Sequence, residues 1–331
     1  MRAVTEDGTS VFLVGDRTRI DAELTRLGVS IRRGGLDGRL EVVHAEEVVG
    51  MDEPAITPIR KKRRSSIRIC AELVQQGRAA AMVTAGNTGA AMIAAKMVMG
   101  TIPGVDRPAL AAVLPSARGR TVLLDVGANV EAKPAYLRQF AVMGHFYAQE
   151  ILGTPRPRVG LMSIGEEEGK GSDVTREVYK VLQQTGLAFV GNVEGSDVFS
   201  GSVDVVVTDG FVGNVVLKSA EALAELVGQM LREELGASAR TRMGYRLAKP
   251  GFDRFRRRTD YREYGAAPLL GVAGGCFIGH GRSNAKAIKS AIRRAREFAA
   301  AGLSEKIRVK VAELHSQEER ILAAATAAAV H

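Results

Sequence analysis

Four segments of the sequence combine glycines with short polar side chains or lysines, which is the composition of anion-binding loops. Backbone N–H groups and side-chain donors of this kind bind phosphate groups, especially where a helix begins. One such segment alone is typical of an ordinary turn, whereas four together favour a binding site for an anionic substrate. The segments comprise residues 84–90, 125–129, 163–171 and 208–218.

The side chains of these segments are rich in hydrogen-bond donors and poor in general bases. The sequence has no Ser-His-Asp order, no HExxH or CxxC spacing, and five histidines that form no ligand pattern. No P-loop and no G-x-G-x-x-G opening follows an apolar run, which argues against a nucleotide or dinucleotide. A donor-rich site suits a nucleophile that is already anionic, such as inorganic phosphate. Phosphate needs alignment rather than deprotonation, and the carbonyl group that it attacks needs stabilisation of its oxyanion. A thioester suits the other half of the reaction, because its thiolate leaves without strong acid assistance.

Three other groups of residues have an ordinary structural explanation beside a chemical one. The three glutamates at 166–168 could bind Mg²⁺, or they could pair with lysines and face solvent. Cys276 and His280 could act as nucleophile and base, although a cysteine in an apolar stretch is more typical of a core residue. The basic run 60–64 is either a solvated face or the entrance for an anionic carrier.

The elements that must position these segments alternate between short apolar runs and longer helical patterns. Near-continuous apolar runs are typical of strands covered on both faces of a sheet. Alternating strands and helices predict a parallel α/β sheet, in which ligands bind beyond the carboxyl ends of the strands. We therefore expect the four segments to meet at one edge of the sheet. The predicted strands are 11–14, 80–83, 110–114, 121–124, 159–162 and 203–207, and the predicted helices are 65–77, 88–99, 133–151, 173–184, 213–236 and 283–300, with helical character again from Leu303.

The composition is that of an ordinary globular protein with an excess of positive charge. The 331 residues include 46 Lys and Arg against 37 Asp and Glu, a formal net charge of +9. Two cysteines exclude a disulfide framework and fit a reducing compartment. The first residues lack the apolar core of a signal peptide and no apolar run is long enough to cross a bilayer, so we expect a cytoplasmic protein. Nucleic acid is not an expected partner, because Trp is absent and aromatic residues are only 5%.

At the same segments the sequence closely resembles the bacterial phosphate acyltransferase family. The resemblance implies transfer of a fatty acyl group from acyl carrier protein to inorganic phosphate, which gives an acyl phosphate for phospholipid synthesis. We expect neither a cofactor nor a metal. The matching stretches are 60–66, 84–90, 125–129, 165–171, 208–218 and 264–271, together with His280 and Gly281.

The resemblance also implies a fold and an assembly. We expect a single α/β domain over residues 1–331, with a Rossmann-like three-layer architecture and a mostly parallel sheet. Such a fold is similar to isocitrate and isopropylmalate dehydrogenases and akin to phosphotransacetylases. The resemblance implies a homodimer, and a helical basic subregion at 213–264 is expected to serve dimerisation and membrane contact. Its arginines, together with Met243, Leu247, Phe252 and Phe255, could rest on anionic lipid.

Lys170 and Asn214 are the residues that we expect at the reacting centre, from their segments and from the resemblance. Lys170 would neutralise phosphate and the charge that develops during the reaction, and Asn214 would donate to the carbonyl oxygen or orient phosphate. The residues expected to bind phosphate and the thioester arm are Gly86, Asn87, Thr88, Asp125, Asn129, Asp209 and Lys218.

Two features depart from the family pattern. Members usually begin with a strand and an Asp-Ala-Met-Gly-Gly-Asp loop, whereas this sequence opens inside what should be the next helix. Either the start is assigned too far downstream, or the chain is a shortened form with one edge of its site missing. Thr84 replaces the usual Ser and preserves the hydroxyl.

The expected partners are an acidic acyl carrier protein, inorganic phosphate, a second copy of the chain, an anionic membrane and a glycerol-3-phosphate acyltransferase. Three other functions stay open on the sequence. They are a phosphotransacylase of small acyl-CoA thioesters, a nicotinamide-dependent dehydrogenase that lacks the glycine fingerprint, and a non-catalytic scaffold for the carrier protein or the membrane.

Overall fold

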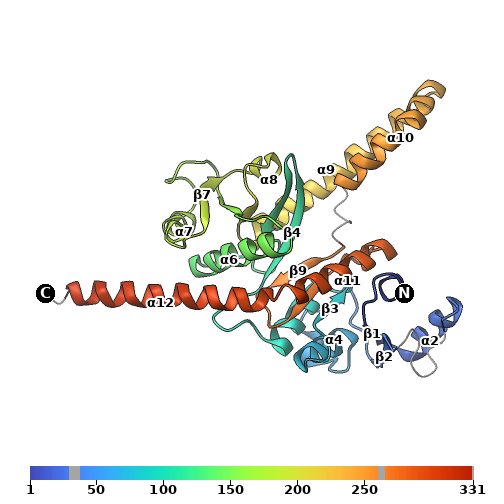
Figure 1. Ribbon diagram of the computed structural model, residues 1–331, viewed down its shortest axis with the longest axis horizontal. Helices are drawn as coiled ribbons and strands as arrows, with labels where there is room; N and C mark the ends of the chain where they lie inside the picture. Colours follow the sequence, from blue (N-terminus) through green and yellow to red (C-terminus); the bar gives the residue numbers. More distant parts are fainter. Residues whose placement is uncertain (30–37, 260–264, 330–331) are drawn as a thin grey trace.

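The computed structural model describes the backbone of residues 1–29, 38–259 and 265–329. Within these residues, eight strands form one sheet of order β3-β10-β9-β4-β5-β8-β6-β7, and β1 and β2 form a separate parallel pair (Figure 1). The strands are β1 (Val11–Gly15), β2 (Leu40–His44), β3 (Ala81–Thr84), β4 (Ala109–Ser116), β5 (Gly119–Leu124), β6 (Arg158–Met162), β7 (Ala188–Val193), β8 (Val205–Val207), β9 (Ala267–Leu270) and β10 (Gly275–Ile278).

Helices account for most of the remaining chain. Those near the amino terminus are α1 (Arg2–Thr5), α2 (Arg17–Arg26), α3 (Thr57–Arg60), α4 (Ser66–Gln75) and α5 (Thr88–Ala94), which continues into the π-helix η1 (Ala95–Met99). The later ones are α6 (Pro134–Glu150), α7 (Asp173–Gln183), α8 (Asp197–Ser200), α9 (Gly210–Gly236), α10 (Ala239–Thr259), α11 (Ala285–Ala300) and α12 (Leu303–Ala329).

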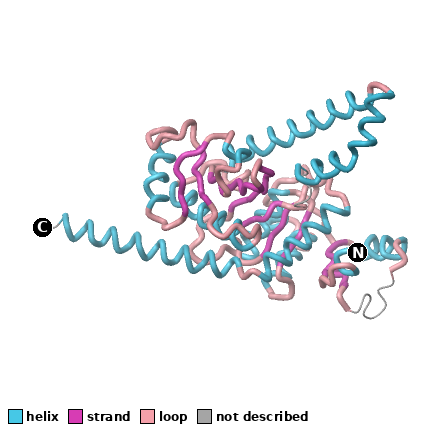
Figure 2. The backbone as a smooth tube through the Cα atoms, turned by 45° about the horizontal axis from the view of Figure 1, so that its top comes forward, coloured by secondary structure: helices cyan, strands magenta, loops and turns pink. Residues whose placement is uncertain are grey.

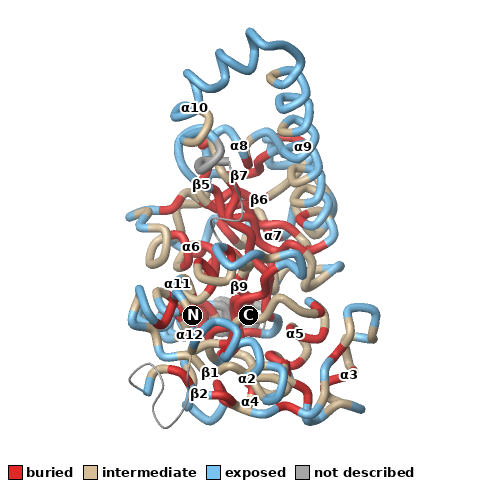
Figure 3. Tube along the Cα trace, turned by 90° about the vertical axis from the view of Figure 1, so that its right-hand side faces the viewer, coloured by how far each residue is buried: buried red, intermediate tan, exposed pale blue. Residues whose placement is uncertain are grey.

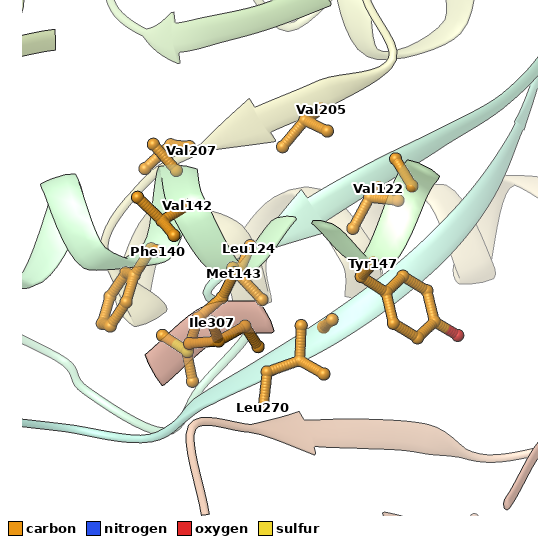
Figure 4. Close-up of a cluster of buried hydrophobic side chains, with 14 of the residues drawn as sticks. Val122, Leu124, Phe140, Val142, Met143, Tyr147, Val205, Val207, Leu270 and Ile307 are labelled. Carbon is orange, nitrogen blue, oxygen red and sulfur yellow. The ribbon is translucent and has the colours of Figure 1, made fainter. Parts of the chain in front are cut away.

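Two hydrophobic cores, one on each face of the large sheet, give the fold its three layers. On one face α6, α11 and α12 pack against the strands, and Figure 4 shows Phe140 and Met143 of α6 in the same cluster as Leu124 of β5 and Ile307 of α12. On the other face α4, α5 and η1 cover the sheet. The central strands are apolar on both faces for this reason; Val205, Val206 and Val207 of β8, for example, are all fully buried. The predicted α/β fold with a mostly parallel sheet is confirmed.

The sheet is nevertheless mixed, and this overturns the expectation that four strand ends meet at one edge. β4 is antiparallel to β5, and β9 is antiparallel to both β4 and β10. β3, which is parallel to β10, therefore runs opposite to β5, β6 and β8. An apolar run indicates burial on both faces but carries no information on strand direction. The pattern of the sequence could not separate β3 from the other three strands.

Two helical features project from the body of the protein. α9 and α10 form an antiparallel hairpin, and α12 extends well beyond the sheet in the opposite direction (Figures 1 and 2). Figure 3 shows that the hairpin is exposed along nearly its whole length, in contrast to the strands below it. Of the residues that the structure describes, no helix is both long and apolar enough to cross a membrane.

Candidate functional site

Three of the four predicted segments lie at one edge of the sheet, where β5, β8 and β6 end. The pairing register aligns Leu124 of β5 with Val207 of β8, and Val207 with Leu161 of β6. The segments 125–129, 208–218 and 163–171 follow these strand ends directly. Because the three strands are parallel neighbours, their carboxyl ends carry these segments to one place.

Asp125 folds the first of these loops around its buried carboxylate. The side chain is fully buried, and it accepts hydrogen bonds from the backbone N–H groups of Leu110 (2.9 Å), Ala128 (3.1 Å) and Asn129 (2.6 Å). Asn129 Nδ2 also donates to Asp125 Oδ2 (3.0 Å) and to the carbonyl oxygen of Pro108 (2.8 Å). The side chains of Asp125 and Asn129, both predicted to bind substrate, thus hydrogen-bond to other residues of the chain. In the structure they hold the loop in position.

The electrostatics of Asp125 reflect two opposing effects. Burial raises the pKa of its carboxyl above the ordinary value, since the charged form loses its hydration. The N–H groups of Ala128, Leu110 and Asn129 oppose that rise in pKa, because they favour the carboxylate. A buried carboxyl held by so many donors is a structural centre rather than a ligand for a second anion.

The start of α9 packs directly on this loop, and two glycines make the approach possible. Asp209 caps the helix by accepting from the N–H of Val212 (2.9 Å), and the N–H of Gly210 donates to the carbonyl oxygen of Asn129 (2.7 Å). A β-carbon at Gly213 would lie 1.8 Å from the carbonyl oxygen of Asp125. The Gly-Phe-Val-Gly opening of the helix is therefore a docking surface for the loop.

Asn214 follows immediately and keeps its amide free. Its side chain lies against Gly127, where an added β-carbon would come within 3.8 Å of Asn214 Oδ1. Gly127 has a φ of 131°, which is in the region that favours glycine. Asn214 is exposed, and no hydrogen bond among the described residues uses its amide.

Lys170 lies on the loop that follows β6. Its backbone N–H donates to the carbonyl oxygen of Glu167 (3.0 Å), which also accepts from Asn192 Nδ2 (2.8 Å). The aliphatic stem of Lys170 packs on Gly165. Its ammonium group is exposed and makes no ion pair with any residue that the structure describes. Lys170 and Asn214 are thus free donors that follow neighbouring parallel strands.

Gly86, Asn87 and Thr88 lie apart from this cluster. They follow β3, which is four strand spacings from β5, about 19 Å at 4.8 Å per spacing. Asn87 Nδ2 donates to the carbonyl oxygens of Gly50, Met51 and Glu53, and Asn87 Oδ1 caps α5 by accepting from Ala90 N–H. Asn87 therefore positions the neighbouring loop, 50–53. A role of these three residues in phosphate binding stays a prediction.

The remaining predicted ligand and the alternative groups also have definite places. Lys218, one turn beyond Asn214, forms an ion pair with Glu221 (2.8 Å). Cys276 lies in the core, and burial raises the pKa of its thiol to about 12, so the nucleophile hypothesis is wrong for this residue. Among the described residues, no three His, Cys, Asp or Glu side chains are arranged to hold a metal ion, the glutamates at 166–168 included.

Several residues that shape the site were not singled out individually in the sequence analysis. Asn192, which is only 4% exposed, holds the Lys170 loop from β7, and that strand was not among the predicted ones. Ser163 follows β6, and its buried hydroxyl beneath Gly171 has no hydrogen-bond partner among the described residues. A polar residue directly after a strand was the available signal for Ser163. The spacing of Gly210 and Gly213 was the signal for the docking of α9.

Comparison with known proteins places this site in context. A family model described as "Fatty acid synthesis protein" matches residues 1–306. The phosphate acyltransferase of Geotalea uraniireducens is 50% identical over 311 residues, which cover 94% of this chain and 88% of the relative. That of Acidobacterium capsulatum is 52% identical over 268 residues, which cover 81% of this chain and 80% of the relative.

Solved structures resemble the chain in fold at low sequence identity. A phosphotransacetylase from Streptococcus pyogenes aligns with a TM-score of 0.55 and 18% identity, covering 87% of this chain and 84% of its own. The EutD phosphotransacetylase from Staphylococcus aureus aligns with a TM-score of 0.51 and 14% identity, covering 89% of this chain and 86% of its own.

Proposed function

The chain belongs to the fatty acid synthesis protein family, and we propose on that basis that it transfers a fatty acyl group from acyl carrier protein to inorganic phosphate. The product is an acyl phosphate for phospholipid synthesis, and the chain is an acyltransferase. The relatives that are about 50% identical are phosphate acyltransferases, which supports both the acceptor and the reaction.

One observation carries the assignment of the reacting centre. Lys170 and Asn214 follow neighbouring parallel strands, and their donors are not used within the described chain, whereas Asp125 and Asn129 are engaged by the loop. Free donors at a shared sheet edge are the groups that an incoming anion meets. Lys170 attracts phosphate, and Asn214 donates to the thioester oxygen or orients phosphate.

The reaction needs alignment and charge stabilisation rather than a strong base. A phosphate oxygen attacks the carbonyl carbon, so that a C–O bond forms while the C–S bond breaks. The carrier thiolate leaves with the bonding electrons and takes a proton from water. Negative charge develops on the carbonyl oxygen in the transition state, and an N–H donor at that oxygen lowers the barrier.

The test is phosphate-dependent consumption of palmitoyl carrier protein. Purified protein is expected to release the carrier thiol only when phosphate is present and to yield a hydroxamate when hydroxylamine traps the acyl phosphate. Preference for acetyl-CoA over the palmitoyl carrier would instead identify a phosphotransacylase of small acyl groups. Absence of turnover with both substrates would leave a scaffold as the function and overturn the proposal.

The basic run 60–64 supports an acidic carrier as the donor. Lys62 is committed to Glu53 (2.5 Å), whose pKa is lowered by that contact, and Arg64 pairs with Glu46 (2.8 Å). Arg60, Lys61 and Arg63 are exposed and form no ion pair within the described residues. Loop 50–53 contacts both Lys62 of this run and Asn87, which follows β3. We therefore place the free cations of the run near the end of β3.

The α9 helix supports a homodimer. Its exposed apolar residues recur at spacings of three and four, which places them on one face of the helix. An apolar stripe of this size on a long helix is not expected to stay exposed to water. We propose that a second copy of the chain covers it. The stripe consists of Leu223, Leu226, Val227, Met230 and Leu231.

The α10 helix supports peripheral contact with an anionic membrane. Met243 and Leu247 are exposed at 57% and 79%, and exposed arginines, including Arg246 and Arg254, lie on the same helix. Apolar and cationic side chains together suit the surface of an anionic bilayer. A membrane position would deliver the acyl phosphate to a glycerol-3-phosphate acyltransferase. The single-domain organisation and the similarity to isocitrate and isopropylmalate dehydrogenases stay predictions.

A further inference from the structure

Each of the three loops at the β5, β8 and β6 edge places a large exposed apolar side chain beside its polar residues. Val130 adjoins Asn129 and is 64% exposed, Ile164 lies on the Lys170 loop and is 81% exposed, and Phe211 adjoins Gly210 and is 62% exposed. Isolated exposed apolar residues are ordinary on a protein surface. Three such side chains, on the loops that follow three neighbouring strands, form a local concentration of apolar surface.

The pairing register indicates that the three side chains belong to one region. Leu124, Val207 and Leu161 are aligned across β5, β8 and β6, and the three loops leave the sheet from that line. The hydrogen bond from Gly210 N–H to the carbonyl oxygen of Asn129 joins the Phe211 loop to the Val130 loop. β6 lies beside β8, so the Ile164 loop is the next neighbour.

The α9 helix extends this region by one more side chain. Val215 follows Phe211 by four residues, so the two share one face of the helix, and Val215 is 48% exposed. The apolar stripe assigned above to the dimer begins at Leu223, eight residues farther on, which is about 12 Å along a helix. The side chains near Asn214 are therefore separate from that stripe.

We propose that Val130, Ile164 and Phe211 form a subsite for the fatty chain of the thioester substrate. The inference rests on the proposed function, because the carbonyl that is attacked sits between the free donors Lys170 and Asn214. The fatty chain attached to that carbonyl extends away from Lys170 and Asn214 and across the three apolar side chains. Each methylene that moves from water onto this surface gains free energy, so the subsite favours long chains.

The test compares acyl chains of two lengths on the same carrier protein. Ile164→Ser and Phe211→Ser remove apolar surface at exposed positions, where the fold does not depend on it. Each is expected to lower kcat/KM for the palmitoyl carrier about tenfold, which corresponds to about 1.4 kcal/mol, and to change kcat/KM for the butanoyl carrier less than twofold. Leu27→Ser is the matched control, because Leu27 is 55% exposed at the end of α2 and its loss should leave both values unchanged.

Direct binding of a fluorescent fatty acid separates this inference from the reaction itself. If the wild type binds cis-parinaric acid and the two variants bind it about tenfold more weakly, the subsite stands even where no acyl phosphate forms. If the wild type makes acyl phosphate and both variants keep its ratio of palmitoyl to butanoyl kcat/KM, the subsite is wrong. Loss of the dimer in sedimentation, with that ratio unchanged, would assign the three side chains to a contact between copies and would equally overturn the proposal.

Discussion

The carbonyl oxygen of Asp125 lies 1.8 Å from the point where a β-carbon of Gly213 would stand. The start of α9 and the loop after β5 are thus in backbone contact, with no room for a side chain between them. This contact sets the position of Asn214, the next residue of the helix. Glycine at 213 is therefore a requirement of the site, and two substitutions within the same helix can test it.

Gly213→Ala should destabilise the protein and displace Asn214. The added methyl group meets backbone atoms, which cannot rotate away, so the helix or the loop must shift. Overpacking of this kind costs about 3 kcal/mol in the free energy of unfolding. Urea denaturation measures that loss, and the phosphate-dependent release of carrier thiol should fall with it.

Gly228→Ala is the matched control in the exposed part of α9. Its β-carbon would meet only the flexible end of Arg232, at 3.6 Å. Alanine is a better helix former than glycine by about 1 kcal/mol, so this variant should gain stability and keep full activity. Equal stability and equal activity of the two variants would show that the close backbone contact at Gly213 does not position Asn214.

Lys170→Ala and Asn214→Ala should each reduce turnover by about 10²–10³, because each removes a donor that acts at the reacting atoms. Both residues are exposed and unpaired within the described chain, so the free energy of unfolding should change little. Stopped assays with hydroxylamine give the turnover. Lys180→Ala, an exposed lysine of α7, is the control. Near-normal acyl phosphate formation by both variants would remove them from the reacting centre.

Charge reversal of Arg60, Lys61 and Arg63 to Glu should weaken the use of the carrier-bound substrate. Complementary charge mainly speeds encounter, so kcat/KM should fall about tenfold at low salt, and the difference should shrink at high salt. A thioester of free pantetheine, which lacks the acidic carrier, should be used as well as before. Reversal of Arg232, Arg240 and Arg246 on the hairpin changes the net charge equally. An equal loss from that control would refute a specific docking surface.

The sequence predicted β1, β3, β4, β5, β6 and β8 and missed β2, β7, β9 and β10. Gly191 and Asn192 interrupt the apolar pattern of β7, whereas β9 and β10 are apolar four-residue strands within the glycine-rich stretch 265–281. Proline removes a hydrogen bond from a helix interior, yet α10 continues through Pro250. The local sequence pattern reports burial and turns, whereas the missed strands and the course of α10 depend on contacts in the tertiary structure.

The candidate site was predictable in its residue types but not in its roles. Lys170 and Asn214 have side-chain donors that no described residue uses, and their place at the reacting centre stays a prediction. Asn87 and Asn129 have the same side-chain chemistry as Asn214, but their amides are consumed by backbone carbonyls. A single sequence cannot distinguish these cases, because the partners of Asn87 lie 34 to 37 residues away along the chain.

Because of His145, the protein should be less stable in mild acid than at neutral pH. His145 lies on α6, and its buried Nδ1 has no hydrogen-bond partner in the part of the chain that the structure describes. Burial lowers the pKa of its imidazole below the ordinary value of 6.5, the positive charge of Lys310 on α12 lowers it further, and a hydrogen bond with the backbone of Pro157 opposes both. The unfolded chain therefore takes up this proton at a higher pH than the folded protein does.

The sign of the pH dependence follows from that difference. Above pH 6.5 the imidazole is neutral in both states and its contribution to stability is complete. As the pH falls through 6.5 towards the lower pKa of the folded state, the unfolded chain binds more protons, so the free energy of unfolding decreases. Urea midpoints at pH 7.5 and 5.5 should differ less for His145→Gln than for the wild type, and the exposed His280→Gln serves as the control. An equal difference for wild type and His145→Gln would show that this imidazole does not resist protonation in the fold.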